Sequence, residues 1–122
     1  MKKLLFILVV SISLFSCKKE ESKPSEKAGE SSLAYGKKLF DGEGNCIACH
    51  QTEQTIIGPS LQEIAKIYKE KNASIVSFLK EESDPIVDPS KYEIMKTNFA
   101  ITEEMTDEEL EAIESYIYST SK

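Results

Sequence analysis

Arginine and tryptophan are absent from this 122-residue chain, and histidine occurs once. All 15 basic residues are therefore lysines, and 21 acidic residues outnumber them, which gives a formal net charge of −6. Because phosphate binding needs clustered cations, we expect no nucleic-acid partner. Aromatic residues make up only 8% of the chain, so a domain this small needs another source of core volume. We therefore expect a cofactor to fill part of the core.

Long apolar runs are also scarce. The run from Leu4 to Leu14 is too short for a bilayer span, which needs ~20 residues, and it follows the basic start Met1-Lys2-Lys3. It leads into Leu14-Phe15-Ser16-Cys17, which resembles the bacterial lipobox, where signal peptidase cuts before a lipid-modified cysteine. We predict a signal peptide over residues 1–16 and lipidation of Cys17; the alternative is an ordinary signal peptide with an incidental cysteine.

Residues 17–32 are predicted to form a tether between the lipid and a folded domain of residues 33–122. The stretch is rich in Ser, Glu and Lys and poor in apolar residues. Such a composition buries too little surface to offset its conformational entropy, which favours a flexible segment. The chain is thus expected to be exported and anchored to a membrane, facing the periplasm or the cell exterior.

Two of the three cysteines lie in Cys46-Ile47-Ala48-Cys49-His50, which also contains the single histidine. The C-x-x-C-H spacing is the attachment pattern of c-type haem: two thiols form thioethers with the vinyl groups, and the histidine ligates the iron. A zinc site needs about four ligands and only three candidates stand here. A thioredoxin-type pair expects a βαβ setting, and a plain disulfide leaves His50 unexplained. We predict one covalently bound haem c, with iron bound by His50.

The rest of the chain predicts helices joined by loops. Apolar residues recur at helical spacing in four places, which begin near Leu33, Leu61, Ile75 and Leu110. The last helix has the clearest start, since Thr106 and Glu109 make a capping box. The third is expected to be capped by Asn72 or Ser74. The stretch Tyr92–Lys96 is predicted to be a loop that returns the chain across the haem.

Three further features follow the haem motif: Gly58-Pro59-Ser60-Leu61, Ile94-Met95-Lys96-Thr97-Asn98 and a C-terminal helix. With these features, the region from Leu33 to Lys122 resembles small bacterial class I c-type cytochromes. The resemblance implies an all-α fold, about four helices wrapped around one haem, with the first helix crossing the last. It also implies that the carbonyl of Pro59 accepts a hydrogen bond from the ring of His50. Tyr68 and Tyr92 would lie near the haem propionates.

Methionine is the expected second iron ligand, and two candidates remain after signal-peptide cleavage. Met105 directly precedes the capping Thr106, where a residue packing on Leu110 is expected. Met95 lies far enough beyond His50 for helices to wrap the ring before the chain returns. We therefore predict Met95 as the ligand, with Met105, or an open or lysine-ligated site, as alternatives.

A haem ligated by histidine and methionine has no open position, which favours an electron carrier over an enzyme. We expect this carrier to be a monomer. Its expected partners are a donor and an acceptor of a respiratory chain. One alternative is a haem enzyme or gas sensor with an open distal site, although no arginine is present to assist peroxide cleavage. The other is a cytochrome subunit permanently docked to an oxidase or dehydrogenase.

Overall fold

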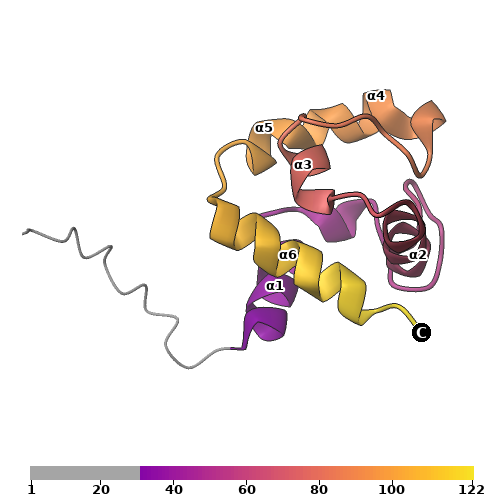
Figure 1. Cartoon of the computed structure of the whole chain (residues 1–122). Helices are drawn as coiled ribbons and strands as arrows, with labels where there is room; N and C mark the ends of the chain where they lie inside the picture. The colour runs from indigo at the N-terminus through magenta and orange to yellow at the C-terminus, as the bar shows by residue number, and fades with distance from the viewer. Residues whose placement is uncertain (1–30) are drawn as a thin grey trace, which may run out of the picture.

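Helices dominate residues 31–122, the part of the chain that the computed structural model describes (Figure 1). The predicted signal peptide, Cys17 and nearly all of the tether lie outside the described residues. No helix within residues 31–122 is long and apolar enough to span a bilayer. The elements are, in order, α1 (Ser32–Asp41), η1 (Cys46–Ala48), α2 (Leu61–Lys71), α3 (Ile75–Leu79), η2 (Pro89–Lys91), α4 (Tyr92–Met95), η3 (Lys96–Asn98), α5 (Phe99–Thr102) and α6 (Asp107–Ser119).

Side-chain caps begin the helices that the apolar spacing predicted. Ser60 caps α2 and Ser74 caps α3, each by accepting a backbone N–H three residues on. Asn72 instead ends α2 in the left-handed region, with φ of 49°. The capping box of α6 is confirmed: Thr106 Oγ1 accepts from Glu109 N at 3.3 Å, and Thr106 N donates to Glu109 Oε2 at 2.9 Å. Each start is therefore determined by residues close in sequence.

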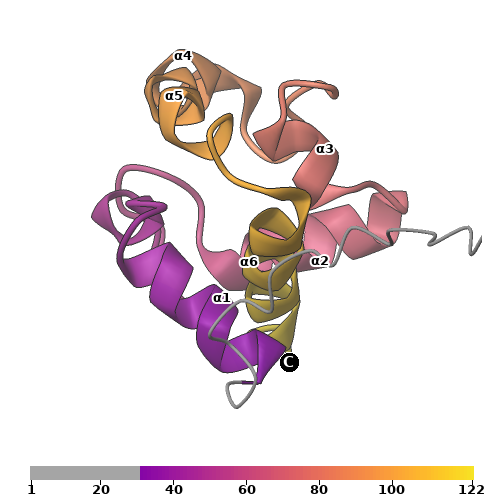
Figure 2. The same cartoon turned by 90° about the vertical axis from the view of Figure 1, so that its left-hand side faces the viewer.

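The first and last helices cross at Gly36, as the views from two sides show (Figures 1 and 2). A Cβ at Gly36 would overlap the backbone carbonyl of Ala112 and lie 3.0 Å from Tyr116 Cβ. Beside this contact, the rings of Phe40 and Tyr116 meet edge to face, with centroids 5.5 Å apart. The absence of a side chain at Gly36 thus lets the two helix backbones approach closely.

The prediction that Tyr92–Lys96 is a loop was wrong. Helical turns follow one another without a break from η2 to α5, so Met95 lies at the end of a helical turn. Asp88 starts the run by accepting from Ser90 N at 3.1 Å, and Pro89 takes the first position, where a missing N–H costs little. These turns are too short to produce an apolar stripe with helical spacing, which is why the pattern missed them.

Aromatic packing holds this run of turns against α3. The ring of Phe78 lies 5.4 Å from Phe99 and 6.3 Å from Tyr92, centroid to centroid. Thr102, fully buried, donates to the carbonyl of Leu79 at 2.8 Å. The turns from η2 to α5 are thus fixed to α3, and they lie at the opposite end of the molecule from α1 (Figures 1 and 2).

Candidate functional site

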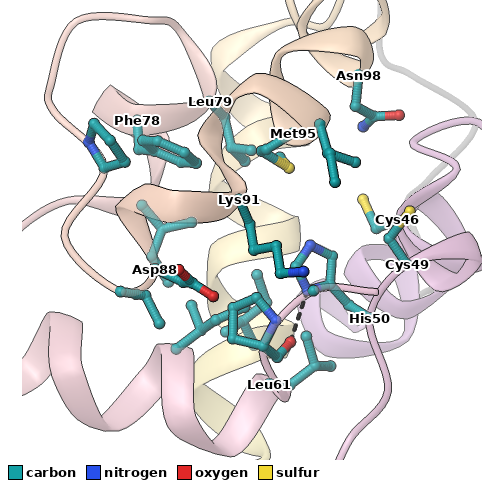
Figure 3. Close-up of a pocket in the computed structure, with 18 of the residues that line it drawn as sticks. Cys46, Cys49, His50, Leu61, Phe78, Leu79, Asp88, Lys91, Met95 and Asn98 are labelled. Carbon is teal, nitrogen blue, oxygen red and sulfur yellow. Dashed lines mark hydrogen bonds between the residues drawn. The ribbon is translucent and has the colours of Figure 1, made fainter. Parts of the chain in front are cut away.

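A mostly apolar cavity lies between the two ends of the molecule, and every helical element except α5 contributes to its lining. Its apolar residues include Leu61 and Ile64 of α2, Ile75, Phe78 and Leu79 of α3, and Ile113 and Ile117 of α6. The haem-motif residues and Met95 line the same space (Figure 3). The cavity thus brings together residues that are distant in the chain.

Both thiols of the C-x-x-C-H motif line this cavity and neither is in a disulfide. Asn45, with a left-handed φ of 51°, turns the chain into η1, and Figure 3 shows the sulfurs of Cys46 and Cys49 on the same side of the cavity. Cys46 is buried, and desolvation raises the pKa of its thiol to about 12. Both cysteines therefore line an apolar space, and Cys46 does so as a neutral thiol.

The ring of His50 is held in one orientation. Its Nδ1 lies 2.7 Å from the carbonyl oxygen of Pro59. A carbonyl only accepts hydrogen bonds, so Nδ1 carries the proton and donates it. Burial lowers the pKa of His50, an effect that the Pro59 hydrogen bond opposes, so the ring is neutral at pH 7. Nε2 consequently keeps a free lone pair, the form in which imidazole binds a metal ion.

Gly58 is a functional position that the sequence analysis mentioned without a role. A Cβ at Gly58 would lie 2.5 Å from His50 Cε1 and 2.9 Å from His50 Nδ1. Its N–H donates to the carbonyl of Cys49 at 2.9 Å, which ties this turn to the haem motif. The sequence signal for this role was the adjacent Pro59. Since Pro59 was expected to contact the His50 ring, a glycine next to it indicates that the backbone approaches the ring closely.

The two candidate methionines have different surroundings. Met95 lines the cavity, and Figure 3 shows its side chain on the opposite side from His50. Met105 packs against the hydrophobic core and is not among the cavity-lining residues. Asn98, to which the sequence analysis gave no role of its own, donates from Nδ2 to the carbonyl of Gly44 at 3.0 Å. That hydrogen bond joins the segment of Met95 to the segment that precedes the two cysteines.

The two tyrosines expected near the haem propionates both line the cavity. Tyr68 is buried, and desolvation raises the pKa of its hydroxyl to about 12. Tyr92 is partly buried beside Phe78 and Phe99. Each thus offers the cavity a largely apolar side chain that ends in one hydroxyl group.

The residues that line the cavity fit a covalently attached haem. Two free thiols and a neutral imidazole with a free ring nitrogen line the cavity, and Figure 3 shows the thioether of Met95 on the opposite side from His50. The surrounding aliphatic and aromatic side chains match the apolar faces of a porphyrin. Comparison with known proteins agrees with this fit, since the model of the family described as Cytochrome c matches residues 33–121.

This chain belongs to the cytochrome c family. As a cytochrome c it carries covalently attached haem c with its iron, and haem-based electron transfer is the role typical of this family. Cytochrome c-552 of Nitrosomonas europaea is 50% identical over 30 residues, which are 25% of this cytochrome c. The matched stretch spans 29% of that relative's length.

Proposed function

We propose that this cytochrome c is a one-electron carrier whose iron is ligated by His50 and Met95, with thioethers at Cys46 and Cys49. The observation that carries the proposal is the pairing of two groups in one cavity. The imidazole of His50 is oriented by Pro59, and the thioether of Met95 lies across from it. When bound, haem supplies an Fe(III)/Fe(II) couple, and ligation by methionine raises its potential.

The residues around these ligands favour electron transfer over chemistry at the iron. With His50 and Met95 as its ligands, the haem iron would have no coordination site left for a substrate or a gas. The apolar lining excludes water, and the hydrogen bond from His50 to Pro59 keeps the imidazole in place during a change of iron charge. The same hydrogen bond increases the basicity of the imidazole as a ligand.

The N-terminal residues suggest where the carrier works. A lipid on Cys17 would hold the monomer at a membrane, facing the periplasm or the cell exterior. Tethering would raise its effective concentration near membrane-bound partners. The proposed partners are a donor and an acceptor of a respiratory chain.

Substitution of each methionine tests the ligand set. Met95→Ala should lower the midpoint potential markedly and abolish the near-infrared sulfur-to-iron charge-transfer band of the ferric protein, because the thioether stabilises the ferrous state. Met105→Ala, the matched control, should keep the band and cost about 1–3 kcal/mol of stability through lost packing. A redox-titrated optical spectrum of the purified holoprotein measures the potential and the band in each variant.

Two results would contradict the proposal. One is the reverse pattern, in which the band survives in Met95→Ala and disappears in Met105→Ala. The other is rapid, tight binding of carbon monoxide by the reduced wild-type protein at neutral pH, since a closed six-coordinate site resists it.

A further inference from the structure

Among residues 31–122, Asp88 and Lys91 are the only charged residues that line the cavity. The Asp88 carboxylate is already used, because its Oδ1 accepts from Ser90 N at 3.1 Å and from Ser90 Oγ at 2.5 Å. The backbone N–H of Lys91 donates to the carbonyl of Asp88 at 3.1 Å, but its side chain makes no hydrogen bond or ion pair with any of residues 31–122. Nearby Lys96, by contrast, lies 3.9 Å from a carboxylate oxygen of Glu93. Lys91 is thus an unpaired cation at an apolar cavity.

The arrangement of the cavity suggests which anion Lys91 meets. On a haem attached through its vinyl groups, the two propionate carboxylates lie at the opposite edge of the porphyrin. Figure 3 shows Cys46 and Cys49 on one side of the cavity and Asp88 on the other, with the side chain of Lys91 reaching across between them. The chain is already acidic, with 21 Asp and Glu residues. The two propionates would add two carboxylates in an apolar space, where a buried charge needs a partner of opposite sign.

We propose that Lys91 pairs with a haem propionate and is a positioning residue that sets the potential of the iron. The proposal rests on the haem orientation implied by attachment at Cys46 and Cys49. An ammonium ion near the iron favours the reduced form, which carries one positive charge fewer, and it offsets the propionate charge that favours the oxidised form. The apolar lining strengthens both effects, since it lowers the local dielectric constant.

Charge-neutral and charge-keeping variants of the holoprotein test this pairing. Lys91→Gln should shift the midpoint potential to a lower value, and Lys91→Arg should restore it towards wild type. Lys96→Gln is the matched control, because it removes the same charge from an adjacent helical turn but does not line the cavity. Its potential should shift much less. All variants should keep the near-infrared band, because Met95 is untouched.

A second measurement reports on the propionate itself. In a redox-difference infrared spectrum, the carboxylate stretching band should move in Lys91→Gln and stay in place in Lys96→Gln. Equal potential shifts in the two glutamine variants would overturn the pairing, since only overall charge would then matter. Loss of the near-infrared band in Lys91→Gln would also overturn it. Failure of the proposed carrier function is distinct, because the wild-type protein would then lack the band or a reversible couple.

Discussion

Gly58 has no functional group, yet the orientation of His50 depends on it. No glycine among residues 31–122 has a positive φ, so the reason for glycine here is space and not backbone conformation. The ring of His50 fills the place where a Cβ would stand, and the hydrogen bond to Pro59 prevents the ring from moving away. A residue without a side chain therefore helps to position the metal ligand.

Gly58→Ala should destabilise the holoprotein by about 1–3 kcal/mol, the usual cost of overpacking a well-packed site. It should also alter the optical spectrum, because the imidazole must turn or lose its hydrogen bond. Urea unfolding and absorption spectra measure the two effects. Pro59→Ala is the control, since it keeps the carbonyl acceptor and should keep the spectrum. Wild-type stability and spectrum in Gly58→Ala would refute this account of the glycine.

At the scale of elements, the crossing of α1 and α6 forms the base on which the haem motif is built. Tyr35 of α1 donates to Glu109 Oε1 at 3.0 Å, and Glu109 also completes the capping box of α6. The start of one helix is therefore bonded to the flank of the other. η1 follows α1 after a short turn, so the orientation of α1 also affects where the cysteines lie.

Gly36→Ala tests how tightly this crossing is packed. In an exposed helix the change would add about 1 kcal/mol of stability, because alanine favours helices over glycine. Here we expect a net loss of about 1–3 kcal/mol, since the methyl group would overlap the backbone of Ala112, which cannot change rotamer. Thermal unfolding of holoprotein gives the sign. The control is Lys38→Ala, on the exposed side of α1, which should change stability by no more than about 0.5 kcal/mol. A Gly36→Ala variant more stable than wild type would be inconsistent with close packing of the two helices.

At the scale of the whole molecule, the haem acts as part of the core. The lining of the cavity includes residues of α1, η1 and α2 as well as residues of the turns that carry Met95. Without a cofactor these apolar side chains would lie open to water. Folding and haem attachment are therefore expected to be linked, since a group held only by the native state contributes its binding free energy to folding.

Replacing Cys46 and Cys49 together by alanine should give a largely unfolded or degraded product. Far-UV circular dichroism and a thermal melt of the purified variant measure this. Ile47→Ala is the control, because Ile47 lies between the two cysteines and is 49% exposed, so haem attachment should survive. Native-like helical content with a cooperative melt in the double variant would show that the protein folds without its cofactor.

Cys17→Ser tests the membrane anchor. The variant should appear in the soluble fraction, because acyl chains contribute about 0.8 kcal/mol for each buried CH₂ group and the tether after Cys17 has few apolar residues. Cell fractionation with a high-salt wash measures the distribution, and Ser22→Ala in the tether should remain with the membrane. A Cys17→Ser variant that stays membrane-bound after the wash would mean that another contact holds the protein.

Several features of this cytochrome c were predictable from sequence because their physical causes are local. The four helices with apolar stripes, the capping box of Thr106 and Glu109, and the haem motif each depend on residues within a few positions of one another. The family resemblance added the crossing of the first and last helices and the contact between His50 and Pro59. Cys17 and the signal peptide stay predictions, since they lie outside the described residues.

Only the tertiary structure decided the remaining features. The helical turns around Met95 depend on packing between Tyr92, Phe78 and Phe99, and a contact between residues far apart leaves no periodic pattern in either segment. The clash that requires Gly58 and the unpaired charge of Lys91 at the cavity likewise depend on neighbours brought close by folding. Local hydrogen bonds and spacing determine where helices begin, whereas the packing of distant side chains determines which of them surround the haem.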